Sequence, residues 1–190
     1  MLGAIALDLK RRGLLKQDRV VSTVMANLGF RRAMAEANIE LIETVVGDRF
    51  VLEAMRQTGA SVGGEQSGHL IFLDHSTTGD GLITGLKVAA LMASSGSKLS
   101  EISRAVPKFP QVLLNVKVVS RDKLQSADRV WEAVREAERT LADTGRVLVR
   151  PSGTEPLVRV MVEADTQPKA TSAAQQIAAV VQEELGAPHA

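Results

Sequence analysis

Cysteine is absent from this sequence of 190 residues, which excludes disulfide bonds and thiolate metal sites and fits a reducing compartment. Aromatic residues are also scarce, at 3%, and the 23 basic and 22 acidic side chains leave a net charge of only +1. Neither a basic run nor an aromatic platform is present, so nothing in the sequence indicates a nucleic-acid partner.

A long apolar run is missing as well. Asp8 interrupts the apolar segment that begins at Leu2, and the basic residues 10–12 follow that segment instead of preceding it. A secretory signal has its charges first, and a membrane span needs about 20 apolar residues. We therefore expect residues 1–13 to form an amphipathic helix, and we expect a cytoplasmic protein without a membrane partner.

The first part of the chain alternates between two kinds of hydrophobic pattern. Strand patterns and helical patterns follow one another over residues 1–106, which predicts an α/β layered domain with a mostly buried mixed sheet. Asp48 is placed to cap one of the helices. A long helix after Thr78 is expected to turn an apolar stripe inward, consisting of Leu82, Leu86, Ala89, Ala90 and Met92.

Two prolines interrupt this pattern. Residues 107–110, P-K-F-P, restrict the backbone and are predicted to be a linker. Residues 111–190 then have the order strand, helix, strand, strand, helix. This order predicts a smaller α+β domain with an antiparallel sheet and its helices on one face.

The first candidate site is the stretch R-P-S-G-T-E-P between the two adjacent strands of the smaller domain. Arg150 can grip two phosphate oxygens through its planar fork, and Ser152 and Thr154 add hydroxyl donors. Gly153 allows backbone N–H groups to turn inward as an anion nest. The alternative is an ordinary turn in which the hydroxyls cap their own backbone and Arg150 pairs with an acid, either Glu155 or Glu163.

The second candidate site is G-G-E-Q-S-G-H, in the first domain. Its glycines permit tight turning and close approach of a ligand, and Glu65 beside Ser67 suits vicinal sugar hydroxyls. With only Glu65 and His69 close together in the sequence, a metal site is weakly supported. The alternative is a glycine-rich loop with Glu65 and His69 paired on the surface. Asp74 and Asp80 flank a loop that could bind a cation, but helix capping by Thr78 or Asp80 is favoured, so no metal ligand is assigned there.

Five segments carry a resemblance to a known family, in the order T-V-M-A-N-L-G, V-V-G-D-R-F-V-L-E, G-G-E-Q-S-G-H, T-T-G-D-G and R-P-S-G-T-E-P-L-V-R-V-M-V-E. Together they resemble the α-D-phosphohexomutase superfamily. Within it, the chain is more similar to the phosphoglucosamine mutases than to the mannose and glucose mutases, because of the Gln in G-E-Q-S-G-H and the V-G-D-R segment. Ala26 stands where a serine is usual.

The resemblance implies the third and fourth domains of a four-domain enzyme, an isomerase. Glu65, Ser67 and Gly68 would hold the sugar hydroxyls, and His69 would assist proton transfer. The non-reacting phosphate would be anchored by the R-P-S-G-T-E-P stretch, through Arg150, Ser152, Gly153 and Thr154. The partner would be a phosphorylated amino sugar, and nothing indicates the oligomeric state.

The implied reaction interconverts glucosamine 6-phosphate and glucosamine 1-phosphate through a bisphosphorylated intermediate, on the route to UDP-N-acetylglucosamine and peptidoglycan. The family's phosphoserine lies in S-H-N-P, and its Mg²⁺ is held by D-G-D-x-D-R. Neither string occurs in this sequence. We therefore expect a fragment that is inactive alone, with Mg²⁺ ligands only in the complete enzyme. The alternatives are a non-catalytic phosphosugar-binding module and an interaction domain in which both loops are simple turns.

Overall fold

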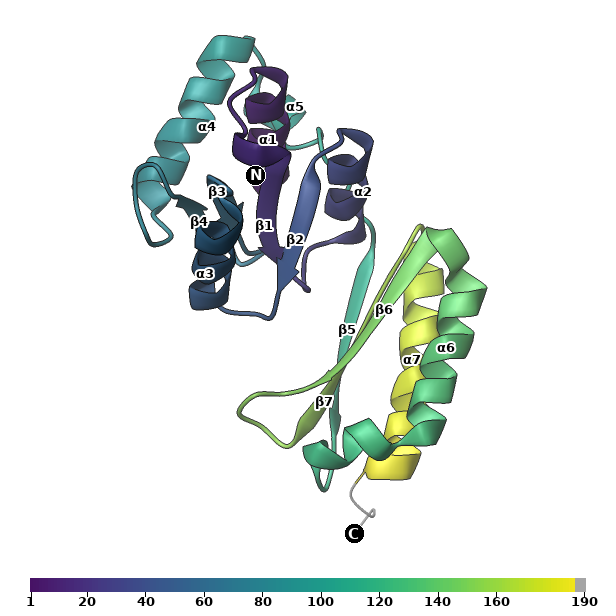
Figure 1. Ribbon diagram of the computed structural model, residues 1–190. Coiled ribbons are helices and arrows are strands. Elements are labelled where there is room, and N and C mark those ends of the chain that lie inside the picture. Colours follow the sequence, from purple (N-terminus) through teal and green to yellow (C-terminus); the bar gives the residue numbers. More distant parts are fainter. Residues whose placement is uncertain (187–190) are drawn as a thin grey trace. The chain divides into compact units, whose positions relative to one another are not determined.

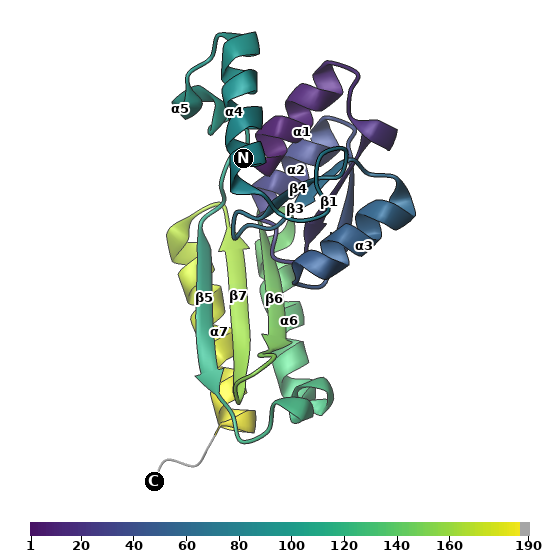
Figure 2. The ribbon, with the colours of Figure 1, turned by 90° about the vertical axis from the view of Figure 1, so that its left-hand side faces the viewer.

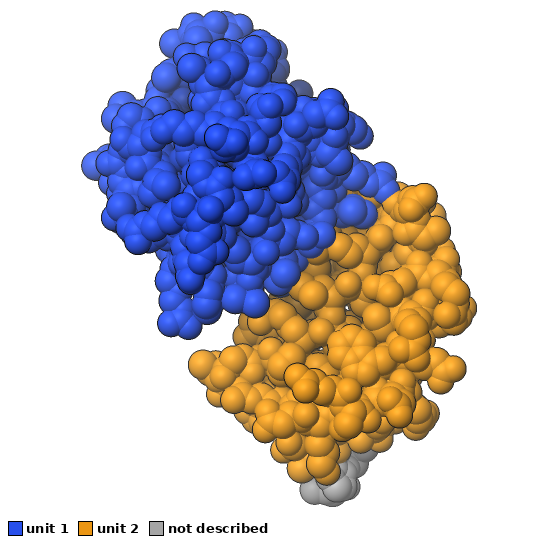
Figure 3. Space-filling model, viewed as in Figure 1, with its two compact units in different colours: residues 1–108 blue, residues 109–190 orange. Residues whose placement is uncertain are grey.

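The structure is a computed structural model that describes residues 1–186. The chain divides into two compact units, residues 1–108 and residues 109–190 (Figure 3). Each unit has its own sheet and its own hydrophobic core.

The first unit is an α/β layered structure (Figure 1). In chain order its elements are α1 (Leu2–Arg11), β1 (Arg19–Thr23), α2 (Leu28–Glu36), β2 (Glu40–Thr44), α3 (Asp48–Thr58), β3 (Val62–Gly64), β4 (Leu70–Phe72), α4 (Gly81–Ser95) and α5 (Leu99–Ile102). The sheet has the order β2-β1-β3-β4. Its first three strands run parallel, and β4 pairs antiparallel with β3, so the sheet is mixed as expected.

Strands β1, β3 and β4 of the first unit are buried, whereas β2 at the edge of the sheet is partly exposed. Val20 and Val62 pack with side chains of α1, α2, α4 and α5, whereas the neighbouring Val21 packs with Val51 and Met55 of α3. Because successive side chains of a strand point to opposite faces, the adjacent valines of β1 serve both layers. This explains why β1 contains two adjacent valines instead of alternating apolar and polar residues.

Helix α4 differs from the sequence-based expectation. The predicted inward stripe was wrong for four of its members, because Leu82, Leu86, Ala89 and Ala90 are exposed. The opposite side of the helix packs on the core instead, through Leu91, Ile83, Val88 and Met92. Apolar residues occupy both sides of α4, so periodicity alone could not identify the buried side.

The second unit is an α+β structure (Figure 2). Its elements are β5 (Gln111–Lys117), α6 (Asp128–Leu141), β6 (Gly145–Pro151), β7 (Leu157–Ala164) and α7 (Gln167–Leu185). The three strands form an antiparallel sheet in the order β5-β7-β6. Both long helices pack on one face of it, where Val158, Val160 and Val162 meet Val134 and Ile177. The predicted fold class is confirmed for both units.

Within residues 1–186, no helix combines the length and the apolarity needed to cross a membrane.

Candidate functional site

The loop of residues 65–69, called here the Glu65 loop, joins β3 to β4. Two backbone hydrogen bonds close it: Glu65 N–H donates to the His69 carbonyl at 2.9 Å, and Gly68 N–H donates to the Glu65 carbonyl at 3.1 Å. Gly68 has a φ of +100°, which a residue with a side chain rarely adopts. The backbone thus fixes a tight turn at whose two ends Glu65 and His69 stand.

The other two glycines of the motif have a different role from the one expected. Gly63 and Gly64 belong to strand β3 and do not turn the chain. A Cβ on Gly63 would lie 2.7 Å from Sδ of Met55, and one on Gly64 would lie 2.4 Å from the His69 carbonyl oxygen. The fold therefore requires glycine at both positions for close packing, independently of any ligand.

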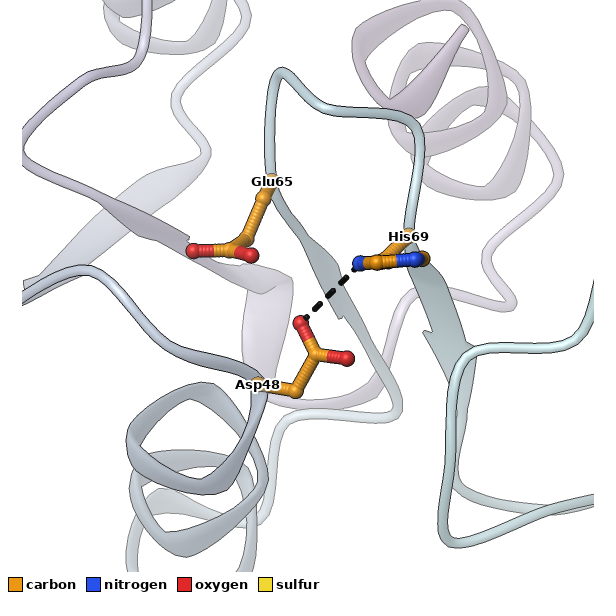
Figure 4. Close-up of side chains that lie close together, drawn as sticks. All are labelled: Asp48, Glu65 and His69. Atoms are coloured by element: carbon orange, nitrogen blue, oxygen red, sulfur yellow. Dashed lines mark ion pairs between the residues drawn. The ribbon is translucent and has the colours of Figure 1, made fainter.

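Three side chains meet beside this loop (Figure 4). Glu65, His69 and Asp48 place one potential ligand atom each within 4.8 Å of one another. Nδ1 of His69 lies 3.4 Å from Oδ1 of Asp48, and Oε1 of Glu65 accepts a hydrogen bond of 2.9 Å from the backbone N–H of Gly47. The pairing of Glu65 with His69, left open by the sequence, is replaced by these two separate contacts.

The role expected of Asp48 was wrong. Helix α3 begins at Asp48 with Gly47 as its N-cap, and no side chain caps its N–H groups. Gly47 has a φ of +137°, a conformation that favours glycine and directs its N–H toward Glu65. The start of α3 thereby positions one carboxylate, Asp48, and holds a second, Glu65.

A cavity of about 430 Å³ adjoins the Glu65 loop. Glu65, Gln66 and Gly68 line it together with Asn27 and Lys108, whereas Ser67 and His69 are exposed outside its lining. Its volume falls within the range typical of small-molecule sites. The structure therefore places Glu65 and Gly68 at a cavity and leaves Ser67 and His69 on the surface.

Strand β1 and the turn after it support this cavity. Ser22 donates a hydrogen bond of 2.8 Å to the Gly64 carbonyl. Ala26, which follows in the same segment, is 4% exposed and is also part of the cavity lining. A serine at position 26 would place a hydroxyl at that wall, so its replacement by Ala26 makes the wall less polar.

The cluster of Asp48, Glu65 and His69 does not fit Mg²⁺. This ion requires near-octahedral oxygen coordination, whereas the cluster offers one imidazole and two carboxylates, of which Glu65 is already hydrogen-bonded to the backbone. Asp80 also accounts for itself, because its carboxylate accepts hydrogen bonds from the N–H groups of Leu82 and Ile83 and caps α4 as expected. We assign no Mg²⁺ ligand within residues 1–186.

The other candidate site is the connection between β6 and β7, residues 150–156, called here the Arg150 loop. Arg150 stands directly opposite Arg159 in the antiparallel register, so the two guanidinium groups share one face of the sheet. Burial, and secondarily the like charge of Arg159, lower the pKa of Arg150 from its ordinary value. Within residues 1–186, Arg150 has no acidic partner.

The acids that could have neutralised Arg150 are occupied elsewhere. Glu163 is fully buried and pairs with Arg146 at 3.0 Å, and Glu155 pairs with Arg159 at 3.5 Å. The Nε atom of Arg159 is buried without a hydrogen-bond partner. Arg150 and the neighbouring Arg159 therefore place two guanidinium groups beside a single exposed carboxylate, Glu155, and this arrangement favours an anion.

The remaining residues of the Arg150 loop divide into a buried serine and an exposed tip. Ser152 is 2% exposed, its Oγ lies 3.4 Å from both the Glu155 backbone nitrogen and the Arg159 guanidinium, and its carbonyl accepts a hydrogen bond of 2.7 Å from Arg121. Ser152 thus organises the loop. Gly153 and Thr154 are exposed at its tip.

The expected anion nest at Gly153 is not formed through a left-handed glycine. Gly153 is not among the residues with positive φ, and a Cβ added to it would have no atom within 4 Å. Neither backbone conformation nor packing therefore demands glycine at this position. What glycine does provide is an uncovered backbone that a ligand can approach closely.

One chain thus joins a mixed-sheet α/β unit, with a carboxylate loop at a cavity, to an α+β unit with a cationic hairpin. Residues 1–109 match the family model described as phosphoglucomutase/phosphomannomutase, alpha/beta/alpha domain III. Residues 113–180 match that of the phosphoglucomutase/phosphomannomutase C-terminal domain. The chain belongs to the phosphoglucomutase/phosphomannomutase family.

Curated relatives narrow this similarity. The chain is 54% identical over 188 residues to a phosphoglucosamine mutase of Frankia alni, covering 99% of this chain and 41% of the relative. It is 50% identical over 174 residues to a phosphoglucosamine mutase of Carboxydothermus hydrogenoformans, covering 92% of this chain and 39% of the relative. The chain thus spans about two fifths of the length of the curated relatives it matches.

Solved structures support the fold. An N-acetylphosphoglucosamine mutase of Aspergillus fumigatus, in complex with GlcNAc-6P and magnesium, superposes with a TM-score of 0.81 at 22% identity, covering 96% of this chain and 43% of that one. A putative phosphomannomutase from Thermus thermophilus has a TM-score of 0.61 at 19% identity, covering 95% of this chain and 40% of that one. At these identities the likeness concerns the fold alone.

Two residues of the candidate sites escaped the sequence analysis. Arg159 could have been found by counting outward from the centre of the hairpin, since an antiparallel register centred there pairs Arg159 with Arg150. Asp48 had no such signal, because the contact between the start of α3 and the Glu65 loop depends on the packing of separate elements.

Proposed function

We propose that this chain supplies the sugar-recognition and phosphate-recognition parts of a phosphoglucosamine mutase. The observation that carries the proposal is the cross-strand pair Arg150 and Arg159, in which Arg150 lacks an acidic partner within residues 1–186 and Arg159 retains an unbonded buried Nε. A phosphate dianion would neutralise both guanidinium groups and accept their N–H donors bidentately. Gly153 and Thr154 would add donors at the exposed tip.

On the sugar side, Glu65 is held by Gly47 in a fixed orientation at the wall of the cavity. Its carboxylate can accept hydrogen bonds from sugar hydroxyls, with Ser67 and the backbone of Gly68 beside it. Asp48 brings a second carboxylate close to the first. Two carboxylates favour the ammonium group of an amino sugar, because that group is a cation with several N–H donors.

His69 would serve as the proton-transfer residue. Its Nδ1 faces Asp48, and a hydrogen bond there would fix the tautomer and leave Nε2 as the free ring nitrogen. Nε2 would then accept or donate a proton at a sugar hydroxyl as that oxygen gains or loses its phosphoryl group.

The reaction would interconvert glucosamine 6-phosphate and glucosamine 1-phosphate through a bisphosphorylated sugar, in the cytoplasm, on the route to UDP-N-acetylglucosamine. The phosphoryl donor would be a phosphoserine, and Mg²⁺ would supply charge neutralisation in the complete enzyme. The strings expected for that serine and for the metal ligands do not occur in this sequence. Phosphoryl transfer depends on these groups, so we expect the chain alone to bind sugar phosphate without turning it over.

Calorimetric titration of the chain with glucosamine 6-phosphate, glucose 6-phosphate and inorganic phosphate tests the proposal. We expect saturable binding of all three, tightest for glucosamine 6-phosphate, and no mutase turnover by the chain alone. Absence of binding to every phosphate would refute the proposed function. Equal binding of the glucosamine and glucose compounds would refute the role given to the two carboxylates while preserving phosphate recognition.

A further inference from the structure

An exposed apolar surface of the first unit lies on helix α4. Six residues spaced three or four apart along α4 are all exposed, and they are called here the outer face of α4: Leu82, Gly85, Leu86, Ala89, Ala90 and Ala93. The side chain of Leu82 is 83% exposed and that of Leu86 is 71% exposed. In Figure 1, α4 forms an outer edge of the unit to which it belongs.

The opposite side of α4 already has its partners. Leu91 is buried in the core, and Ile83, Val88 and Met92 pack against the same cluster. Lys87, the single charged residue of the helix, lies 5.8 Å from the ring centre of Phe72. A helix that is apolar all round is normally buried on all sides, yet half of this one faces solvent.

We propose that the outer face of α4 is the docking surface for the preceding part of the full-length phosphoglucosamine mutase chain. The two family models matched here are domain III and the C-terminal domain, and the matched segment is only 41% of the Frankia alni relative. Those relatives therefore contain domains numbered ahead of domain III, and these domains must pack against the rest of the same chain. The preceding chain would join at α1, which packs against α4.

The composition of the outer face supports this occupant. It contains two leucines, three alanines and one glycine, with no charged or polar side chain. Uncharged, strongly apolar surfaces are typical of permanent interfaces, whereas transient ones resemble the rest of a protein surface. The small residues Gly85, Ala89 and Ala93 follow one another at intervals of four and would let a partner helix approach closely. A membrane surface is disfavoured, because membrane-bound helices carry several basic residues along their polar side.

The absence of cysteine permits a direct test, because one introduced cysteine becomes the chain's single thiol. Leu86→Cys would be placed in the chain alone and in a fusion of the chain to the preceding part of the Frankia alni relative. Maleimide labelling of the Leu86→Cys peptide would be followed by mass spectrometry. The control is Val119→Cys in the second unit, whose parent side chain is similarly exposed at 66%.

We expect Leu86→Cys to be labelled at least about tenfold more slowly in the fusion than in the chain alone, because burial limits thiol reactivity. Val119→Cys should be labelled equally in both. Equal labelling of Leu86→Cys in both proteins would overturn the proposal. Slow labelling of Leu86→Cys in the chain alone would also overturn the proposal. A labelling rate that depends on protein concentration would then indicate that a second copy covers the face, and a rate that does not would indicate the chain's own second unit.

A second arm does not require a folded fusion. The preceding part of the Frankia alni relative would be added in trans to the wild-type chain, to the double variant Leu82→Glu/Leu86→Glu and to the control Val119→Glu. We expect association with the wild type and the control, and a loss of about thirtyfold or more for the double variant, as for a buried hot spot. No association with the wild type, or equal losses for both variants, would overturn the proposal. The exposed positions predict unchanged melting temperatures for all variants.

Discussion

The two candidate loops share a topology and differ in how the fold uses their residues. Each joins two antiparallel strands, β3 to β4 in one case and β6 to β7 in the other. In the Glu65 loop the functional groups already have protein partners, since Glu65 accepts from Gly47 and His69 faces Asp48. In the Arg150 loop, Arg150 stands beside a second cation and within residues 1–186 has no acid of its own.

The side chains of the Glu65 loop are therefore oriented before a ligand binds, whereas the Arg150 loop has an unfavourable charge repulsion before a ligand binds. The Glu65 loop is held in place without ligand. A mutation in it should therefore lower the affinity for the sugar phosphate only moderately and leave the affinity for inorganic phosphate unchanged. The Arg150 loop carries a repulsion that a phosphate would relieve, so its contribution to binding should be large. The following experiments test the contrast in order of decreasing effect.

The largest effect is expected for Arg150→Ala. We expect the affinity for inorganic phosphate to fall roughly a hundredfold, about 2.7 kcal/mol, because a charged bidentate contact is lost. Arg150→Lys should recover only part of it, since a point charge cannot reproduce the planar fork. Calorimetry on the three proteins measures this. A full recovery by lysine would show that charge alone matters at this position.

The next effect contrasts two glycines. Gly64→Ala should reduce the free energy of unfolding by about 2 kcal/mol, as for an overpacked core site, because its Cβ would meet the His69 carbonyl. Gly153→Ala should change it by less than about 0.5 kcal/mol, because the space around it is open. Urea denaturation measures both. For Gly153→Ala we also expect weaker phosphate binding, and unchanged binding would assign Gly153 no role in recognition.

A smaller effect is expected for Glu65→Gln. The affinity for glucosamine 6-phosphate should fall about tenfold, as for loss of a charged hydrogen-bond acceptor, while inorganic phosphate should bind as before. The reason is that Glu65 belongs to the first unit and Arg150 to the second. If both ligands weaken in parallel, sugar and phosphate recognition are not divided between the two loops.

The smallest effect is expected for Ser152→Ala. Its hydroxyl lies at 3.4 Å from each of its two partners, a weak geometry, and its carbonyl contact to Arg121 survives the substitution. We expect a loss of about 1 kcal/mol or less in stability and a phosphate affinity far closer to wild type than that of Arg150→Ala. Equal affinity losses for Ser152→Ala and Arg150→Ala would contradict the ranking of the two residues.

The pH dependence of phosphate binding should follow the ionisation of the phosphate and not that of Arg150. The pKa of Arg150 is lowered, but from so high a value that we expect the side chain to stay charged at neutral pH. A cation with a lowered folded-state pKa costs stability when protonated, and this cost is constant well below that pKa. The affinity for glucosamine 6-phosphate should therefore rise as pH passes the second pKa of its phosphate monoester, about 6, and titrations at pH 5.5 and 7.5 would check it. A flat profile would show that the monoanion binds equally well.

The sequence was sufficient for the architecture and for locating the two candidate loops, whose roles in binding stay predictions. Periodicity predicted both sheets, and the two hairpin motifs could be recognised because their residues are contiguous. It could not orient α4, where apolar residues surround the helix, nor place Asp48 next to His69, which requires the packing of α3 against the sheet. It also misjudged Gly63 and Gly64, because close packing and ligand access both favour glycine.

The position of β7 has a consequence for amide hydrogen exchange. β7 is bonded on both sides, whereas β6 is an edge strand, so Arg159 belongs to the central strand and Arg150 to the margin. Amides of a central strand exchange mainly through global opening of their unit, and amides of an edge exchange through local fraying. The anion site would therefore combine Arg159, on a central strand that opens only globally, with Arg150, on an edge strand that frays locally. Phosphate binding should then slow amide exchange mainly in β6, because the backbone of this strand is the more mobile of the two before the ligand binds.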